Sequence, residues 1–476
     1  MEVSSANPRG KRSETVLLGL TLFFTILYLP LAVPLEFSAT REDYVFLVGV
    51  ACLVAAALLS LTALTVKVPL ALMPAWGPAL LIAPLLREGQ LSYVAIGLGC
   101  TVIGLIALLI SEMGGRRKLL DDLPPEVFLG IRAAVGSVVA ITSIDLINRY
   151  SPDQQVWLFP IFLVALTLMI LWDRLASALR QKGERASVNY LYLIAQLHYF
   201  VIPLLACMFA VAIGALTPDG PSYPSIKPAV TTAGIQLLIM VSVGLALLLF
   251  LLTDVPGHPY DLLRSREMTA KLKVAEDADR RILAGFRMDA VGMGSSGTLF
   301  MLGIPLSPPL YVSENNLIRD FNWVSGNAAF CTALLFALLG LLALLFPSEL
   351  IMISGYAYFA VAPVLSFIAV KMIARSMIRE EEVAEPAPDP GGADVGDGPP
   401  KAFPRFSQAI DFYLPAALMI LLTSFPRLPL VVVIPVGVVA ACSFRFFRNE
   451  KVETSAWVVC GFAALSLLIS VGVRYI

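Results

Sequence analysis

The sequence predicts an all-α polytopic membrane protein. Hydrophobic residues make up 58% of the 476 residues and charged residues only 14%, whereas a soluble chain keeps about a quarter of its residues charged. The hydrophobic residues also occur in uncharged runs of roughly 20, the length at which a helix crosses the hydrocarbon core of a bilayer. The balance of charge, −1 overall, gives no indication of a nucleic-acid partner.

Apolar runs follow one another along nearly the whole chain, separated by short polar loops. They predict about 14 transmembrane spans, at 15–37, 44–66, 68–86, 91–112, 126–146, 155–173, 191–216, 229–253, 284–302, 306–318, 326–346, 351–374, 409–425 and 428–445, with a further apolar run at 454–473. The third and tenth spans are short and interrupted by prolines. Because proline lacks the N–H that a helix interior needs, we expect both spans to be broken.

Basic residues gather in alternate loops, and this sets the expected orientation. Residues 1–14, the run Arg116-Arg117-Lys118 and the loop at 264–281 share one side, whereas the opposite loops carry single basic residues. Cytoplasmic loops carry the excess of Lys and Arg, so we expect a cytoplasmic N-terminus in a protein of the cell membrane. Residues 380–404 are acidic and rich in Pro and Gly, which predicts a disordered cytoplasmic linker. The sequence leaves open whether 454–473 crosses the membrane.

The two broken spans hold matching places in two halves of seven spans, 15–217 and 229–445. An odd number of spans forces the halves into opposite orientations, which is the inverted-repeat plan of many secondary transporters. A helix interrupted within lipid exposes N–H and C=O groups unless they face protein or a wet cavity. We therefore expect the two breaks to face each other and to frame a polar pocket.

Five short motifs occur in an order that resembles a known family. They are LGLTLFFTILYLPLAVP in the first span, VPLALMPAWGPALL in the third, LLTDVPGH in the eighth, RMDAVG in the ninth and PLYVSENN in the tenth. Together they resemble the nucleobase–cation symporter-2 superfamily, with a pattern closest to the adenine/hypoxanthine/guanine permeases and with motifs similar to those of the uracil permeases. The resemblance covers nearly all of 15–445. It implies a uracil-permease-like fold of two inverted repeats of seven spans, a homodimer, and transport of a nucleobase.

The resemblance also implies a substrate site. Residues at the matching motif positions, which would bind the base or line the start of a half-helix, are Trp76, Asp254, Tyr311, Ser313, Glu314 and Asn315. A charged carboxylate inside a membrane is costly unless a proton neutralises it. Asp254 and Glu314, with His258 linked to the coupling acid, are therefore the residues that we expect to carry a co-transported proton.

Two functions remain open at this point. The first is proton-coupled uptake of a nucleobase or purine-like planar solute, with H⁺ preferred over Na⁺ as the coupling ion. The alternative is an anion transporter or exchanger of the same fold, as in the sulfate-permease relatives, although Glu314 would repel an anion. No nucleophile–His pair, nucleotide-binding loop or metal-ligand cluster is evident in the sequence, so we expect neither an enzyme nor a bound metal or cofactor. Arg287 and Asp289 are candidates for a structural ion pair within the ninth span, and we expect His198 to be a packed histidine.

Overall fold

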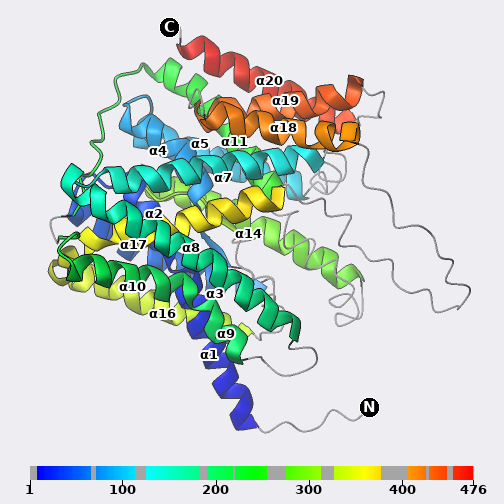
Figure 1. Ribbon diagram of the computed structural model, residues 1–476. Coiled ribbons are helices and arrows are strands. Elements are labelled where there is room, and N and C mark those ends of the chain that lie inside the picture. The colour runs from blue at the N-terminus through cyan, green and yellow to red at the C-terminus, as the bar shows by residue number, and fades with distance from the viewer. Residues whose placement is uncertain are drawn as a thin grey trace, which may run out of the picture.

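The computed structural model describes residues 8–65, 71–112, 125–182, 190–217, 220–254, 275–311, 326–376, 406–424, 428–447 and 454–474. Long helices run side by side through most of this part of the chain, and two short strands lie among them (Figure 1). In chain order the elements are α1 (Pro8–Ile26), α2 (Tyr28–Phe37), α3 (Arg41–Thr65), β1 (Leu72–Pro74), α4 (Trp76–Arg87), α5 (Tyr93–Glu112), α7 (Pro125–Asn148), α8 (Pro152–Lys182), α9 (Tyr190–Gln196), α10 (His198–Ala212), α11 (Ala233–Asp254), α14 (Ala275–Met301), β2 (Pro309–Tyr311), α16 (Gly326–Leu345), α17 (Pro347–Ser376), α18 (Phe406–Ser424), α19 (Leu430–Phe447) and α20 (Thr454–Arg474).

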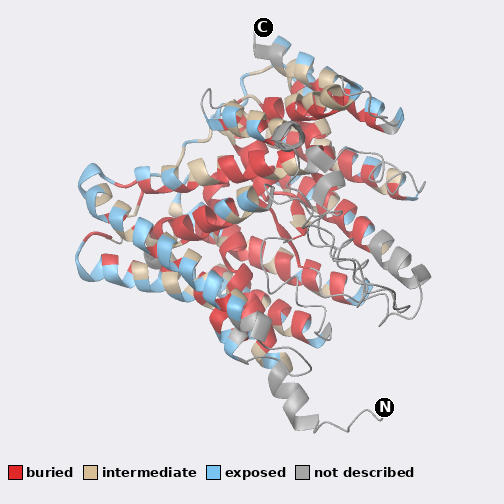
Figure 2. Ribbon diagram, turned by 45° about the vertical axis from the view of Figure 1, so that its right-hand side comes forward, coloured by how far each residue is buried: buried red, intermediate tan, exposed pale blue. Residues whose placement is uncertain are grey.

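The surface of the bundle is strongly apolar. Eight helical segments of the described chain are long and apolar enough to cross a membrane, and three shorter apolar helices lie in α10, α19 and α20. Figure 2 shows buried residues in the interior and exposed residues along the outer helices. Many of the exposed side chains are large and apolar, such as Leu171 at 61% and Leu334 at 71%. A water-soluble protein rarely exposes apolar surface on this scale, so the outer faces suit lipid.

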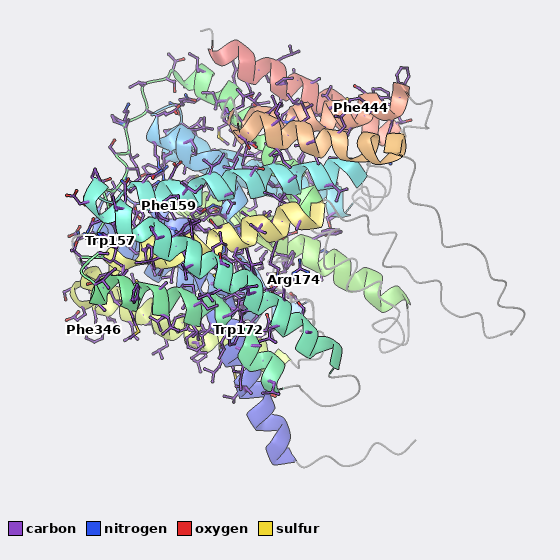
Figure 3. All side chains as sticks on the ribbon, viewed as in Figure 1. Trp157, Phe159, Trp172, Arg174, Phe346 and Phe444 are labelled. Carbon is purple, nitrogen blue, oxygen red and sulfur yellow. The ribbon has the colours of Figure 1, made fainter. Side chains whose placement is uncertain are left out.

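Helix α8 carries two exposed tryptophans that lie 15 residues apart. Trp157 is 60% exposed and Trp172 is 43% exposed, and Arg174 follows two residues later (Figure 3). At 1.5 Å per residue the two tryptophans stand about 22 Å apart along the axis. Tryptophan collects at the two interfaces of a bilayer whose hydrocarbon core is about 30 Å thick. This spacing fits a helix that spans the membrane.

The packing of the helices repeats between the two halves of the chain. Helix α3 packs along α16 in the same way that α5 packs along α14, and α1 contacts α16 as α11 contacts α5. By order along the chain, the counterparts in the two halves are α1 and α11, α3 and α14, and α5 and α16. Each of these contacts in one half therefore has its equivalent in the other. The predicted fold class, an all-α membrane protein with two inverted repeats, is therefore confirmed. The residue limits of the two halves, 15–217 and 229–445, stay a prediction.

Glycines allow α5 and α14 to approach closely. A Cβ added to Gly297 would lie 2.6 Å from the carbonyl oxygen of Gly97 and 2.8 Å from the backbone nitrogen of Thr101. Contacts through small residues are the usual way in which membrane helices pack, because lipid gives them no hydrophobic drive to associate. This pair of helices supports the region in which the broken spans meet.

The predicted break in the third span is confirmed, and the first and seventh spans are kinked at a single residue whose backbone stays helical. The third span consists of β1 followed by α4, whereas the first divides into α1 and α2 at Leu27 and the seventh into α9 and α10 at Leu197. Pro30 accounts for the kink in the first span, because it has no N–H to donate to the carbonyl of Ile26, where α1 ends. In the tenth span, Pro309–Tyr311 form β2, and the residues after Tyr311 lie outside the described part of the chain. The expected linker at 380–404 lies outside the described residues.

The apolar run that we expected at 454–473 is helix α20. It packs against α11 and α19, and Ser242 of α11 is hydrogen-bonded to Ser466 of α20, with 2.9 Å between their Oγ atoms. One face of α20 is buried, including Ala456 and Ala463. The C-terminal helix is therefore an integral part of the bundle.

Candidate functional site

The broken third and tenth spans pair with each other as two antiparallel strands. Leu72 lies opposite Tyr311, Met73 opposite Leu310 and Pro74 opposite Pro309. The sequence favours extended chain here, because Met73, Ser307 and Pro308 each precede a proline, and a residue in that position is disfavoured in the α conformation. The expectation that the two breaks face each other is confirmed.

Hydrogen bonds continue the pairing beyond the strands. The N–H of Ala75 donates to the carbonyl of Pro308 at 3.2 Å, and the Ser307 hydroxyl donates to the carbonyl of Ala75 at 2.7 Å. Ser307 is fully buried and was not predicted as a site residue; its position directly before two prolines is the only sequence signal that marks it. These bonds fix the backbone immediately before α4.

Helix α4 begins at the end of this strand pair without a side-chain cap. Ala75 occupies the N-cap position, and its side chain accepts no hydrogen bond. The first N–H groups of a helix have no acceptor within the helix, and together they carry about half a positive charge. Ala75 is 8% exposed and Trp76 is 6% exposed, so this positive end lies inside the protein. An acceptor or an anion is the chemical partner that it fits.

The indole ring of Trp76 lies at the same position. Its Nε1 atom is buried and donates no hydrogen bond to any described residue. A buried polar group without a partner costs about 1–3 kcal/mol, so the indole N–H is a donor that a bound solute would satisfy. The role of Trp76 in binding a substrate stays a prediction.

The C-terminal part of α11 reaches the start of α4. A Cβ on Gly77 would lie 3.3 Å from the ring of Phe250, so a larger residue here would require the ring to shift. Asp254, the predicted eighth-span acid, is the last residue of α11, one helical turn beyond Phe250. The backbone of α11 therefore carries Asp254 toward the strand pair, while its side chain lies outside the described residues.

A stripe along α14 faces the tenth span. The Tyr311 hydroxyl donates to the carbonyl of Gly285 at 2.7 Å, a Cβ on Gly292 would lie 2.4 Å from Pro309, and the Ser296 hydroxyl donates to the carbonyl of Leu306. Asp289 is four residues after Gly285 and three before Gly292, so it lies on the same helix face. It is fully buried. The structure thus brings an acid to the strand pair that the sequence assigned to an ion pair.

Arg287 does not form the predicted ion pair with Asp289. Arg287 pairs with Glu112 of α5, with 2.6 Å between Nε and Oε1, and both side chains are about half exposed. Residues two apart on a helix point in different directions, which is why Arg287 reaches outward while Asp289 faces the strands.

The structure separates two residues that the sequence grouped together. Tyr311 pairs with Leu72, four residues before Trp76, so about 13 Å of extended chain lies between the two positions. Tyr311 is buried and holds β2 against α14. The predicted site residues Ser313, Glu314 and Asn315, as well as His258, lie outside the described residues.

His198 is a packed histidine, as expected. It is 2% exposed, and its ring centroid lies 4.5 Å from that of Tyr199 and 5.6 Å from that of Phe367. Its Nδ1 atom lies 2.9 Å from the carbonyl oxygen of Ala195. Its position at the start of α10 is distant in sequence from the strand pair.

An ionic cluster that the sequence did not predict joins the far end of α4 to α7. Glu36, at the end of α2, is 3% exposed, and it forms an ion pair with Arg87, the last residue of α4. Arg87 also donates to the backbone carbonyl of Glu36 at 2.8 Å. Arg149 approaches the same carboxylate at 3.7 Å, and its guanidinium lies 5.4 Å from the centre of the Tyr358 ring. The cluster thus ties α2 and α4 to the α7–α17 pair.

Comparisons with known proteins agree with this architecture. No protein-family model matches the sequence, and a comparison with curated proteins gives no match. Among solved structures, the chain is similar to the transmembrane domain of a cyanobacterium bicarbonate transporter, BicA, with a TM-score of 0.51 and 12% sequence identity. The alignment covers 90% of this chain and 97% of that one. The chain therefore has the fold of a transmembrane transporter domain, and it is a multi-pass membrane protein.

Proposed function

We propose that this protein is a secondary active transporter that carries a small anion, bound at the N-terminus of α4. The observation that carries the proposal is the buried, uncapped start of this helix next to the paired strands. Half-helix N-termini that point at anionic groups are a recurrent binding element of transporters with inverted repeats. The similarity to the transmembrane domain of a bicarbonate transporter supports the same substrate class.

Asp289 supplies a group that a coupling cation would use. Its carboxyl group is fully buried on the face of α14 that contacts β2. An ionised carboxylate in this position is costly, so it takes up a proton or a cation when the carrier reorients. We propose Asp289 as a coupling residue, together with Asp254 and Glu314 from the sequence.

A nucleobase is the second candidate substrate, and Trp76 favours it. The indole provides a buried ring and a donor without a partner. Stacking of a base on an aromatic side chain contributes about 1–3 kcal/mol. A planar solute with acceptors on its edge would use both features.

Two substitutions at Ala75 distinguish the candidates. Ala75→Asp and Ala75→Asn both cap α4, and Asp and Asn are about equally good N-cap residues, so both variants are expected to fold. Only the aspartate adds a negative charge at the helix start. In proteoliposomes with imposed pH or Na⁺ gradients, we expect Ala75→Asp to lower uptake of an anion such as bicarbonate at least tenfold relative to Ala75→Asn, because about 1.4 kcal/mol of repulsion suffices for that factor.

The panel of solutes includes bicarbonate, sulfate, uracil, xanthine, adenine, guanine and hypoxanthine. Uptake of a nucleobase, equally affected by both Ala75 variants, would reject the anion and support the second candidate. Asp289→Asn is expected to abolish gradient-driven uptake, whereas Glu349→Gln, at an exposed position of α17, is the matched control. Equal activity of Asp289→Asn and the wild-type protein would remove Asp289 from the mechanism.

A further inference from the structure

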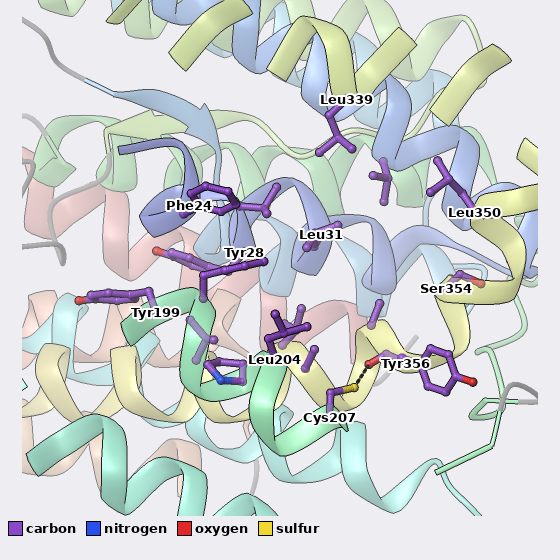
Figure 4. A pocket seen from close by; sticks show the side chains of 18 of the residues that line it. Phe24, Tyr28, Leu31, Tyr199, Leu204, Cys207, Leu339, Leu350, Ser354 and Tyr356 are labelled. Atoms are coloured by element: carbon purple, nitrogen blue, oxygen red, sulfur yellow. Dashed lines mark hydrogen bonds between the residues drawn. The ribbon is translucent and has the colours of Figure 1, made fainter. Parts of the chain in front are cut away.

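An apolar pocket lies between α1–α2, α3, α10, α16 and α17, and no residue of the strand pair lines it (Figure 4). Its volume is about 580 Å³, within the range of about 300–1,000 Å³ typical of small-molecule sites. Most of its wall is aliphatic or aromatic. Representative residues are Phe24 and Leu31 from the first span, Leu204 and Met208 from α10, and Leu350 and Ala360 from α17.

Several of the polar groups in the wall have hydrogen-bond partners within the protein. The Tyr44 hydroxyl donates to the carbonyl of Leu31 at 3.1 Å, and the Ser354 hydroxyl donates to the carbonyl of Ile351 at 2.7 Å. The Cys207 thiol lies 3.8 Å from the carbonyl of Tyr356, as Figure 4 shows. A ligand of this pocket therefore finds apolar contacts and little that would hold a polar group in place.

The second repeat shows what occupies the corresponding place there. Helices α11 and α19 are the counterparts of α1–α2 and α10, and α20 packs against both of them. In the first repeat, the corresponding elements α1–α2 and α10 border the pocket. The longest segment outside the described residues, 377–405, is acidic and rich in Pro and Gly, so its composition does not fit an apolar pocket. Among the described residues, no side chain fills the space of the pocket, so it is open to an apolar occupant.

The pocket wall continues onto a surface that faces lipid. Leu204, Met208 and Val211 line the pocket and are 43%, 59% and 43% exposed. They lie on α10, an apolar helix without a charged residue. At this position the neighbouring medium is the hydrocarbon region of the bilayer, and the molecules that reach the pocket from the side are lipid chains.

We propose that the pocket binds one acyl chain of a membrane phospholipid. The acyl chain packs between the first-span helices and α10, whose counterparts in the second repeat, α11 and α19, are covered in part by α20. It needs no hydrogen-bond partner, which agrees with the satisfied polar groups in the wall. Because the pocket also touches α17, the lipid contacts helices from both halves of the molecule.

Native mass spectrometry of the full chain, purified from membranes in a mild detergent, tests this proposal. The wild-type protein should retain one phospholipid through the activation that strips the others. Leu204→Trp and Ala360→Phe fill the pocket from opposite walls, and each should lower the retained fraction about tenfold, because the added ring takes up the space of the chain. Leu421→Trp, on α18 at a position that is 56% exposed, is the matched control and should retain the phospholipid.

Thermal unfolding of the variants without added lipid shows whether each one is folded. If one of the two filling variants does not fold, the other still tests the proposal. Equal retention of phospholipid by the wild-type protein and by both folded filling variants would overturn the proposal. A retained free fatty acid in place of a phospholipid would also overturn it. So would a shift from dimer to monomer in both filling variants with unchanged lipid retention, because a second copy of the chain would then cover the pocket.

Discussion

The substitution Gly297→Ala tests the close packing of α5 against α14. The added methyl group would lie 2.5 Å from Oγ1 of Thr101, 2.6 Å from the carbonyl oxygen of Gly97 and 2.8 Å from the backbone nitrogen of Thr101. Favourable contacts between heavy atoms require about 3.5–4.0 Å. Two of the three atoms belong to the backbone of α5, so no side-chain rotation relieves the overlap, and the helices must separate.

The expected magnitude follows from two opposing terms. Overpacking of a well-packed interior costs about 1–3 kcal/mol, and alanine has a helix propensity up to about 1 kcal/mol better than that of glycine. With the full propensity gain, we therefore expect Gly297→Ala to lower the free energy of unfolding by up to about 2 kcal/mol. Gly294 lies three residues earlier on the same helix, and a Cβ there meets nothing within 4 Å. Gly294→Ala keeps the propensity gain without the overlap, so it should leave the stability unchanged or raise it.

Equilibrium unfolding in mixed micelles of a mild detergent and dodecyl sulfate, followed by circular dichroism, measures both variants. The informative quantity is the difference between them, because the chemical change is the same at both positions. If Gly297→Ala is as stable as Gly294→Ala, the α5–α14 interface does not require a glycine at this contact, and the packing argument is refuted.

Three further outcomes follow from named contacts. Glu36→Gln removes the charge that neutralises Arg87. In the same unfolding assay it should lower the free energy of unfolding by about 1.5–3 kcal/mol, the contribution of a hydrogen bond to a charged group. An unchanged unfolding midpoint would contradict the ion pair between Glu36 and Arg87. Tyr311→Phe removes the hydroxyl that donates to the carbonyl of Gly285, and it should lower the free energy of unfolding by about 0.5–1.5 kcal/mol. An unchanged free energy of unfolding would show that the strand pair does not depend on this hydrogen bond. Burial raises the pKa of Tyr150 well above its ordinary value; above about pH 10 the unfolded state loses the phenolic proton while the folded state keeps it, so stability falls as pH rises. The decline between pH 9 and pH 11, measured by thermal unfolding, should be shallower in Tyr150→Phe, and equal slopes would contradict the burial of this phenol.

Several features of the protein follow from the sequence because they depend on local chemistry. Apolar runs of about 20 residues fix the membrane-spanning class, since only a helix satisfies its own backbone groups in lipid. Prolines at 74, 308 and 309 fix extended backbone within the third and tenth spans, because the preceding residue is disfavoured in the α conformation. The position of Trp76 directly after such a break also made it a candidate for the site.

Other features were decided only by tertiary packing. Pairing of Leu72 with Tyr311 places Ser307 beside Ala75 and moves Tyr311 away from Trp76, and no local pattern encodes this register. Asp289 faces the strand pair because Gly285 and Gly292 turn the same face of α14 toward β2, whereas Arg287 finds Glu112 on another helix. Local sequence sets which backbone groups and side chains are available, but their partners lie far along the chain. Only the close packing of the helices brings those partners together.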